Sequence, residues 1–329
     1  MKRNWWKEAV AYQVYPRSFN DSNGDGIGDL PGLIEKLDYL ENLGIDVIWL
    51  SPMYPSPNDD NGYDISDYKG IMSEFGTMND FDQLLSSIHQ RGMKLILDLV
   101  VNHTSDEHPW FIESKSSKTN AKRDWYIWAD PKPDGSEPNN WESIFNGSTW
   151  EFDESTKQYY FHLFSKKQPD LNWENPDVRQ AVFEMMNWWF EKGIDGFRVD
   201  AITHIKKNFE AGDLPVPDGK KFAPAFDVDM NQPGIQEWLQ EMKDKSLSRY
   251  DIMTVGEANG VTPNDAEEWV GEENGKFNMI FQFEHLGLWS TGDTKFDVKS
   301  YKQVLNRWQK QLENVGWNAL FIENHDQPR

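Results

Sequence analysis

The feature that most constrains the fold is a repeated alternation of short apolar segments with longer amphipathic ones. The apolar segments predict seven strands: Ala9–Tyr15, Val47–Leu50, Leu95–Val101, Gly196–Asp200, Ile252–Gly256, Lys276–Phe281 and Asn318–Ile322. Apolar residues at helical spacing predict helices at 31–43, in a segment that carries Phe81 and Ile88 and ends at Gly92, and at 176–192, 233–246 and 297–313. Strands that alternate with helices predict an α/β fold with a parallel sheet, either open or closed as a (β/α)8 TIM barrel.

The strand count is one short of a closed barrel. An eight-stranded barrel cannot close on seven strands and keep both edges paired. We therefore expect the chain to stop before the eighth strand, so that either the native protein continues past Arg329 or this chain is a fragment.

The alternation is interrupted after the third strand. Residues 104–172 are polar and rich in Trp, Lys, Asp and Asn, with strand-like pieces such as Gln158–Phe164. A structureless loop of that length is uncommon inside a compact domain. We predict a first part of the barrel domain at 1–103, a small inserted domain at 104–172 and a continuation of the barrel at 173–329.

Composition excludes several kinds of partner and chemistry. With 33 Lys and Arg against 55 Asp and Glu, the net charge is −22. The sequence has no basic stripe with which to bind nucleic acid or an anionic membrane. The absence of Cys excludes disulfides and thiolate chemistry. No apolar run is long enough to span a bilayer, and the first residues do not resemble a secretory signal. We expect a cytoplasmic protein that is a monomer or a weak homo-oligomer.

Polar residues gather where the predicted strands end. Four clusters stand at such positions: Asp98–His103, Gly196–Asp200, Val255–Asn259 and residues 323–326. In a barrel the carboxyl ends of the strands form the catalytic face. Arg198 and Asp200 are two residues apart and so lie on one side of their strand. A structural ion pair would explain these two alone, but not four clusters on one rim.

These segments resemble the characteristic regions of the α-amylase superfamily, glycoside hydrolase family 13. Gln168–Trp173 resembles a fifth region, and the opening segment Trp6–Phe19 is similar to the branch of oligo-1,6-glucosidases and α-glucosidases. The resemblance spans the chain in the right order. Members of this family also carry a C-terminal β domain and a later arginine that pairs with the residue matching Asp64, neither of which is found here.

The resemblance implies a retaining glycosidase that uses two carboxyl groups in different protonation states. Asp200 would be the nucleophile, and Arg198 beside it would lower its pKa. Glu257 would be the acid/base, with a pKa raised by burial and by the charge of Asp200. Asp326 would stabilise the oxocarbenium-like transition state.

The resemblance also implies substrate contacts. His103 and His325 would bind hydroxyl groups of the sugar at the cleaved position. Asp64 would hold the non-reducing end, with Tyr63 as a stacking face, although Tyr63 could instead cap the rim of the barrel. Asp98 would orient Arg198 and Asp200 rather than contact the sugar.

A metal loop is predicted from ligand spacing near the amino terminus. Oxygen ligands recur at positions one, three, five, seven and nine of the loop: Asp21, Asn23, Asp25, the Ile27 carbonyl and Asp29. The glucosidase branch carries such a loop after its first strand. We expect structural Ca²⁺, with Mg²⁺ as the alternative ion. In the competing interpretation Asp29 only caps the helix that Pro31 opens.

Two positions bear on the linkage that is cut. By the resemblance, Ala201 and Asn259 match relatives that act on α-1,4 bonds, since α-1,6-acting members usually have Val at the first position. We predict an exo-acting α-glucosidase for terminal α-1,4-linked glucose of short malto-oligosaccharides. The alternatives are an oligo-1,6-glucosidase or dextran glucosidase, a trehalose-6-phosphate hydrolase and a glucosyl transferase. A non-catalytic transporter-type relative is disfavoured, because Asp200, Glu257 and Asp326 are all present.

Overall fold

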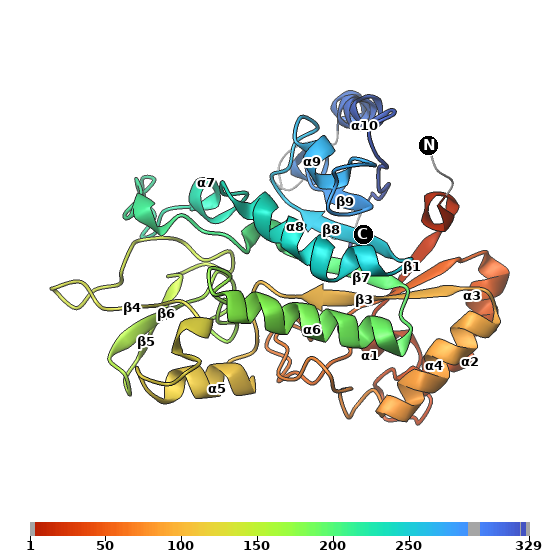
Figure 1. Cartoon of the computed structure of the whole chain (residues 1–329), viewed down its shortest axis with the longest axis horizontal. Coiled ribbons are helices and arrows are strands. Elements are labelled where there is room, and N and C mark those ends of the chain that lie inside the picture. Colours follow the sequence, from red (N-terminus) through yellow and green to blue (C-terminus); the bar gives the residue numbers. More distant parts are fainter. Residues whose placement is uncertain (1–3, 289–296, 323, 327–329) are drawn as a thin grey trace.

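The computed structural model describes residues 4–288, 297–322 and 324–326, and its main feature is a curled six-stranded parallel sheet (Figure 1). The strands lie side by side in chain order: β1 (Ala11–Val14), β2 (Val47–Leu50), β3 (Lys94–Val100), β7 (Gly196–Asp200), β8 (Met253–Ala258) and β9 (Met279–Gln282). Sequential parallel order with helical crossovers is the arrangement of a (β/α)8 barrel. The predicted fold class is therefore confirmed, as a half-barrel.

Helices follow the strands as the apolar spacing predicts. The longer ones are α4 (Met78–Gln90), α5 (Pro109–Ser116), α6 (Pro176–Lys192), α8 (Ile235–Lys245) and α10 (Val298–Leu312). Short α-helical segments are α1 (Pro16–Phe19), α7 (Phe226–Asp229) and α9 (Ala266–Val270). Thr77 opens α4 through a capping box with Asp80, and Gly193 ends α6 in the left-handed conformation.

Two predicted elements differ from the structure. The single helix expected at 31–43 is divided into α2 (Leu30–Glu35) and α3 (Leu37–Leu43), because the Lys36 N–H bonds to the carbonyl of Leu33 in a tighter turn. The strand expected at Asn318–Ile322 is wrong. Leu320 and Ile322 are exposed, and Phe321 reaches β9 only through its ring, 4.9 Å from that of Phe281. This segment is apolar, but it makes no ladder with a neighbouring strand.

The inserted region folds around a sheet of its own. Strands β4 (Trp128–Ala129), β5 (Trp150–Asp153) and β6 (Gln158–Phe161) form an antiparallel sheet in the order β4-β6-β5, toward which β3 points in Figure 1. Its apolar core also takes in Ala225 and Val228. The packing of the insert therefore continues beyond residue 172, into the segment that follows β7.

The described residues also form 3-10 helices at Trp5–Glu8, Arg123–Trp125, Ile202–His204, Phe209–Ala211, Leu247–Arg249 and Leu286–Leu288. Among the helices of the described residues, none has the length and apolar character needed to cross a bilayer.

Candidate active site

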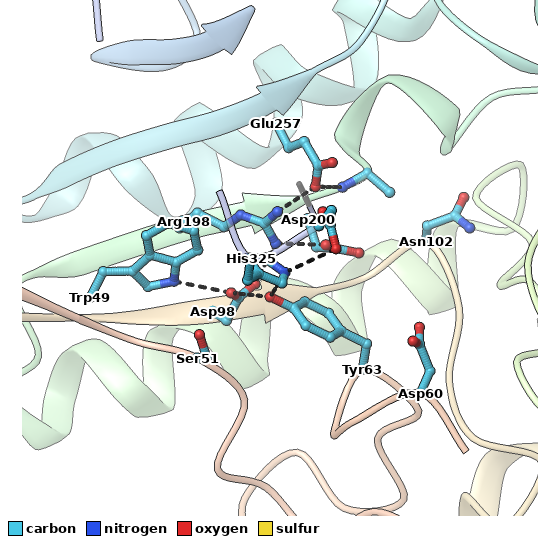
Figure 2. Close-up of polar contacts among 12 residues, drawn as sticks. Trp49, Ser51, Asp60, Tyr63, Asp98, Asn102, Arg198, Asp200, Glu257 and His325 are labelled. Atoms are coloured by element: carbon cyan, nitrogen blue, oxygen red, sulfur yellow. Dashed lines mark hydrogen bonds and ion pairs between the residues drawn. The ribbon is translucent and has the colours of Figure 1, made fainter. Parts of the chain in front are cut away.

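A buried guanidinium organises the carboxyl ends of the central strands (Figure 2). Arg198 of β7 donates from Nη1 to Asp98 Oδ1 at 2.8 Å and to Asp200 Oδ1 at 2.6 Å, and from Nη2 to Glu257 Oε2 at 2.5 Å. The register explains this convergence, because Asp98 lies opposite Arg198 in the parallel β3–β7 pair and Glu257 stands on β8, the next strand. Three carboxyl groups from three strands therefore share one positive charge.

Burial raises the pKa of both candidate catalytic acids. The pKa of Asp200 is raised to about 6 by burial, which outweighs the attraction of Arg198, and the charge of Asp98 raises it further. The pKa of Glu257 is raised to about 7, chiefly by burial, with the charge of Asp200 and a hydrogen bond to it in the same direction. The expectation that Arg198 lowers the pKa of Asp200 below its usual value is wrong. The predicted order of the two groups holds, since Glu257 keeps its proton to higher pH.

Asp98 and two rings enclose the guanidinium from the other side. Asp98 Oδ2 accepts hydrogen bonds from Trp49 Nε1 and from the Tyr63 hydroxyl, both at 3.0 Å. The guanidinium carbon of Arg198 lies 5.2 Å from the centroid of the Trp49 ring and 5.7 Å from that of Tyr63. Asp98 is thus placed to orient Arg198, and aromatic faces limit the freedom of the cation.

A cavity of about 1460 Å³ lies between the two edge strands β1 and β9. Its polar lining includes Tyr15, Asp60, Tyr63, His325 and Asp326. His325 stacks parallel to Tyr63, with ring centroids 5.5 Å apart, and its Nε2 lies 3.0 Å from the Tyr63 hydroxyl. Asp326 is exposed, and its Oδ1 lies 3.5 Å from His325 Nε2. The last described segment therefore brings a third carboxylate to the mouth of the site.

The residue expected to hold the non-reducing end is not in this cavity. Asp64 is fully buried and accepts hydrogen bonds from the Ser56 hydroxyl and from the N–H groups of Asp59 and Asp60. Its oxygens are engaged in holding their own loop together. Asp60, which sequence reasoning missed, lines the cavity instead, and burial raises its pKa to about 6. In the sequence, the signal for Asp60 is the pair Asp59 and Asp60, which precedes Asp64 in the motif Asn-Asp-Asp-Asn-Gly-Tyr-Asp.

The remaining residues predicted to contact the substrate, which are His103, Ala201 and Asn259, lie in different surroundings. His103 is buried, with Nε2 at 3.2 Å from the carbonyl oxygen of Tyr63. Ala201 follows the nucleophile candidate with a positive φ of 43° and donates its N–H to Glu257 Oε2 at 3.2 Å. The carbonyl of Asn259 accepts a hydrogen bond from Asn231, which ties the segment after β8 to the loop before α8.

The predicted metal loop forms a set of turns closed by its own carboxylates. Asp21 accepts hydrogen bonds from the N–H groups of Asn23, Gly24 and Gly26, which lower its pKa. Asp25 accepts from Ile27 N–H, and Asp29 caps α2 by accepting from Gly32 N–H. The capping expected in the competing interpretation is therefore present. In the described part of the chain, no group of three or more His, Asp or Glu side chains converges as a metal site.

Comparison with known proteins places this half-barrel and its carboxylate cluster in one family. Residues 13–329 match the model of the α-amylase catalytic domain. The chain is 64% identical over its whole length to a probable oligo-1,6-glucosidase 3 of Bacillus subtilis (strain 168), and 59% identical to an oligo-1,6-glucosidase of Parageobacillus thermoglucosidasius. A crystal structure of trehalose-6-phosphate hydrolase from Bacillus licheniformis superposes with a TM-score of 0.94 at 50% identity over 99% of this chain.

The chain spans 59% of the length of each of these three proteins. The parallel half-barrel, with acidic side chains at the carboxyl ends of its strands, has the architecture of a (β/α)8 catalytic domain. Within that class, the chain belongs to the α-amylase family.

Proposed function

We propose that this chain is the catalytic part of a retaining, exo-acting α-glucosidase that prefers α-1,6-linked glucose in short oligosaccharides. The supporting observation is the pair Asp200 and Glu257, which share one guanidinium and have different pKa values, about 6 and about 7. A site that must supply an anionic nucleophile and a proton donor at the same pH needs such a pair.

In the proposed reaction Asp200 attacks the anomeric carbon while Glu257 donates its proton to the glycosidic oxygen. The bond from carbon to that oxygen breaks, its electron pair leaves with the departing sugar, and a glucosyl ester forms on Asp200. Glu257, now ionised, takes a proton from water, whose oxygen attacks the same carbon and frees Asp200. Asp326 would stabilise positive charge on the ring in both transition states.

For substrate contacts, we propose Asp60 in the role expected of Asp64, because Asp60 lines the cavity and Asp64 does not. Tyr63 and His325 offer a stacked ring pair and a hydroxyl at the same wall. His103 would contribute from the inner side, next to Tyr63.

The linkage favoured here differs from the one favoured by the sequence. Two of the compared proteins are named oligo-1,6-glucosidases, and one of them is 64% identical to this chain. The contrary indication rests on Ala201 and Asn259. At residue 201 the difference from Val is two carbon atoms, and such a change in a pocket is worth only about 1–3 kcal/mol. Small α-1,6-glucosides are therefore the proposed substrates, with α-1,4-glucosides as the second candidate.

A substrate panel tests this assignment in the full-length protein. We expect kcat/KM on isomaltose to exceed that on maltose by about tenfold, with α-glucose as the first anomer released in NMR spectra. A trehalose-6-phosphate hydrolase, the function named for the structural relative, would instead act on trehalose 6-phosphate and lose most of its activity on trehalose. Release of β-glucose would contradict retention, and a preference for maltose would restore the α-1,4 assignment.

Ala201→Val gives a second test of the linkage. Ala201 has a φ of 43°, a conformation that costs a β-branched residue about 1–2 kcal/mol, so we expect a lower melting temperature. The larger side chain beside the nucleophile should raise the ratio of kcat/KM on isomaltose to that on maltose by about threefold to tenfold. Ala201→Gly is the matched control, since it relieves the backbone without filling the pocket. If the ratio is the same in all three proteins, residue 201 does not set the linkage.

We also propose that the loop from Asp21 to Asp29 binds Ca²⁺ in a structural role, with Mg²⁺ as the alternative. The support is the donor set, which consists of hard oxygen ligands at alternate positions of the loop. Removal of the ion with EDTA should lower Tm by roughly 5 °C, and Ca²⁺ should restore it. Asp21→Asn should show the lower Tm without EDTA. An unchanged Tm in both cases would mean that the loop is closed by its own hydrogen bonds alone.

A further inference from the structure

A buried polar cluster lies behind His103, outside the set of catalytic carboxylates. Lys207 and Asp170 form an ion pair of 2.5 Å, and both side chains are almost entirely removed from solvent. The Lys207 ammonium also donates to Asn102 Oδ1 at 2.9 Å. Asn102 Nδ2 donates to Asp170 Oδ2 at 3.0 Å. The three residues come from the loop after β7, the inserted region and the end of β3.

These contacts fix the orientation of the Asn102 amide. Its oxygen faces an ammonium and its nitrogen faces a carboxylate. A flipped amide would place the oxygen against the Asp170 carboxylate and the nitrogen against the Lys207 ammonium, two repulsive contacts in a buried site. The second N–H of Asn102 is thereby directed at His103 Nδ1, 3.2 Å away.

The partners of the imidazole then select its protonation. Because Asn102 Nδ2 can only donate, Nδ1 must accept and carries no proton. Nε2 carries the proton and donates to the carbonyl oxygen of Tyr63 at 3.2 Å. In the opposite tautomer only the contact from Gln168 Nε2, at 3.1 Å, would be a hydrogen bond. The protonated Nδ1 would face the Asn102 N–H, and the lone pair on Nε2 would face the Tyr63 carbonyl oxygen. Burial also lowers the pKa of His103 to about 4, which keeps the ring neutral.

We propose that the cluster of Lys207, Asp170 and Asn102 holds His103 as its Nε2–H tautomer, so that its one N–H binds the Tyr63 carbonyl oxygen and fixes the loop that carries Tyr63 and Asp60. Nε2 is the nitrogen on the side of Tyr63 and Asp60, since Gln168 Nε2 lies next to it and donates to Asp60 at 2.9 Å. Lys207 and Asn102 are positioning residues, which act through His103 on the loop that carries Tyr63 and Asp60. The effect of this loop on turnover rests on the function proposed above, whereas the tautomer does not.

The tautomer is measured directly by ¹⁵N NMR of the full-length, substrate-free protein labelled with ¹⁵N-histidine. His103→Gln identifies the signals. We expect an unprotonated Nδ1 and a protonated Nε2 in the wild type. Asn102→Asp replaces the donor with an isosteric acceptor, so Nδ1 should become protonated. Lys207→Met removes the ammonium that holds the amide oxygen, and should give a mixture of tautomers.

Kinetics supply the second measurement. Asn102→Asp should lower kcat/KM about tenfold, the effect of one misdirected hydrogen bond. Asn175→Asp is the control, because Asp still caps α6 by accepting from the Asp177 N–H and loses only the exposed bond to the Asp124 carbonyl, so its kcat/KM should stay within about twofold.

A protonated Nδ1 in the wild type would overturn the proposal, and so would an unprotonated Nδ1 in Asn102→Asp. An unchanged tautomer in Lys207→Met would overturn the part assigned to Lys207. These spectra need no turnover, so they stand even if the proposed glucosidase activity fails its own test. The wild-type spectrum also remains decisive if a variant does not fold.

Discussion

Asp200→Asn is expected to lower kcat/KM on every α-glucoside substrate by roughly 10⁴-fold or more, because the variant lacks the carboxylate proposed to form the covalent intermediate. The amide cannot act as the nucleophile, although it can still accept a hydrogen bond from Arg198. The variant should stay folded, since the buried guanidinium keeps its ion pair with Asp98 and its hydrogen bond with Glu257. Circular dichroism and Tm provide that check.

The azide reaction of Asp200→Ala identifies the role of the residue. Azide can enter the space left by the carboxylate and attack the anomeric carbon of an activated aryl α-glucoside from the opposite face. One inversion gives β-glucosyl azide, which NMR distinguishes from the α product. Asp251→Asn, an exposed carboxylate away from the cluster, serves as the control and should keep wild-type kinetics. Near-normal activity of Asp200→Asn, or α-glucosyl azide from Asp200→Ala, would refute the assignment.

Much of the catalytic rim could be predicted because strand periodicity is a local property. The two-residue spacing of Arg198 and Asp200 fixes a common face, and both do lie together in the structure. Elements with a strong apolar period, such as α6, were predicted within a residue for the same reason. The β3–β7 register, which places Asp98 opposite Arg198, joins residues 100 positions apart and is not given by any local pattern.

The loop between β2 and α4 shows where local reasoning fails. Its motif contains three carboxylates, and which of them reaches the cavity depends on a turn with positive φ at Asn61 and Gly62. That turn sends Asp60 to the cavity and Asp64 into the loop's own hydrogen bonds. Side-chain direction in such a turn is set by tertiary contacts and not by spacing.

The pKa of Asp200 was misjudged for a related reason. Proximity to Arg198 could be read from the sequence, but the loss of solvent around both groups could not. Desolvation opposes the charged form of a carboxyl group, and here it exceeds the attraction of the cation, which is shared by three carboxylates.

The two raised pKa values predict a narrow, bell-shaped pH dependence. In the proposed mechanism, turnover needs Asp200 ionised and Glu257 protonated. As pH rises, kcat/KM should therefore increase through about 6, where Asp200 loses its proton, and decrease through about 7, where Glu257 loses its own. The two apparent pKa values of this profile describe the pair of groups and not either residue alone, since the two groups interact. A flat profile between pH 5 and pH 9 would contradict the assignment of both residues.

Glu257→Gln carries the second large effect and separates the acid from the nucleophile. Loss of the proton donor should lower kcat/KM on isomaltose by about 10²–10⁴-fold, because its leaving group is a poorly stabilised alkoxide. On p-nitrophenyl α-glucoside the leaving group needs little protonation, so formation of the glucosyl ester should slow much less. The decrease in kcat/KM above pH 7 should disappear in the variant, since the group that produced it no longer titrates.

Azide again gives the decisive product. In Glu257→Ala, Asp200 still forms the glucosyl ester, and azide then attacks in place of water. Two inversions give α-glucosyl azide, the opposite of the product expected from Asp200→Ala. The two alanine variants thus control each other: the same reagent replaces one of two carboxyl groups that share Arg198, and the configuration of the product reports which of them is missing. If both variants gave the same anomer, Asp200 and Glu257 could not hold the two separate roles that their pKa values indicate.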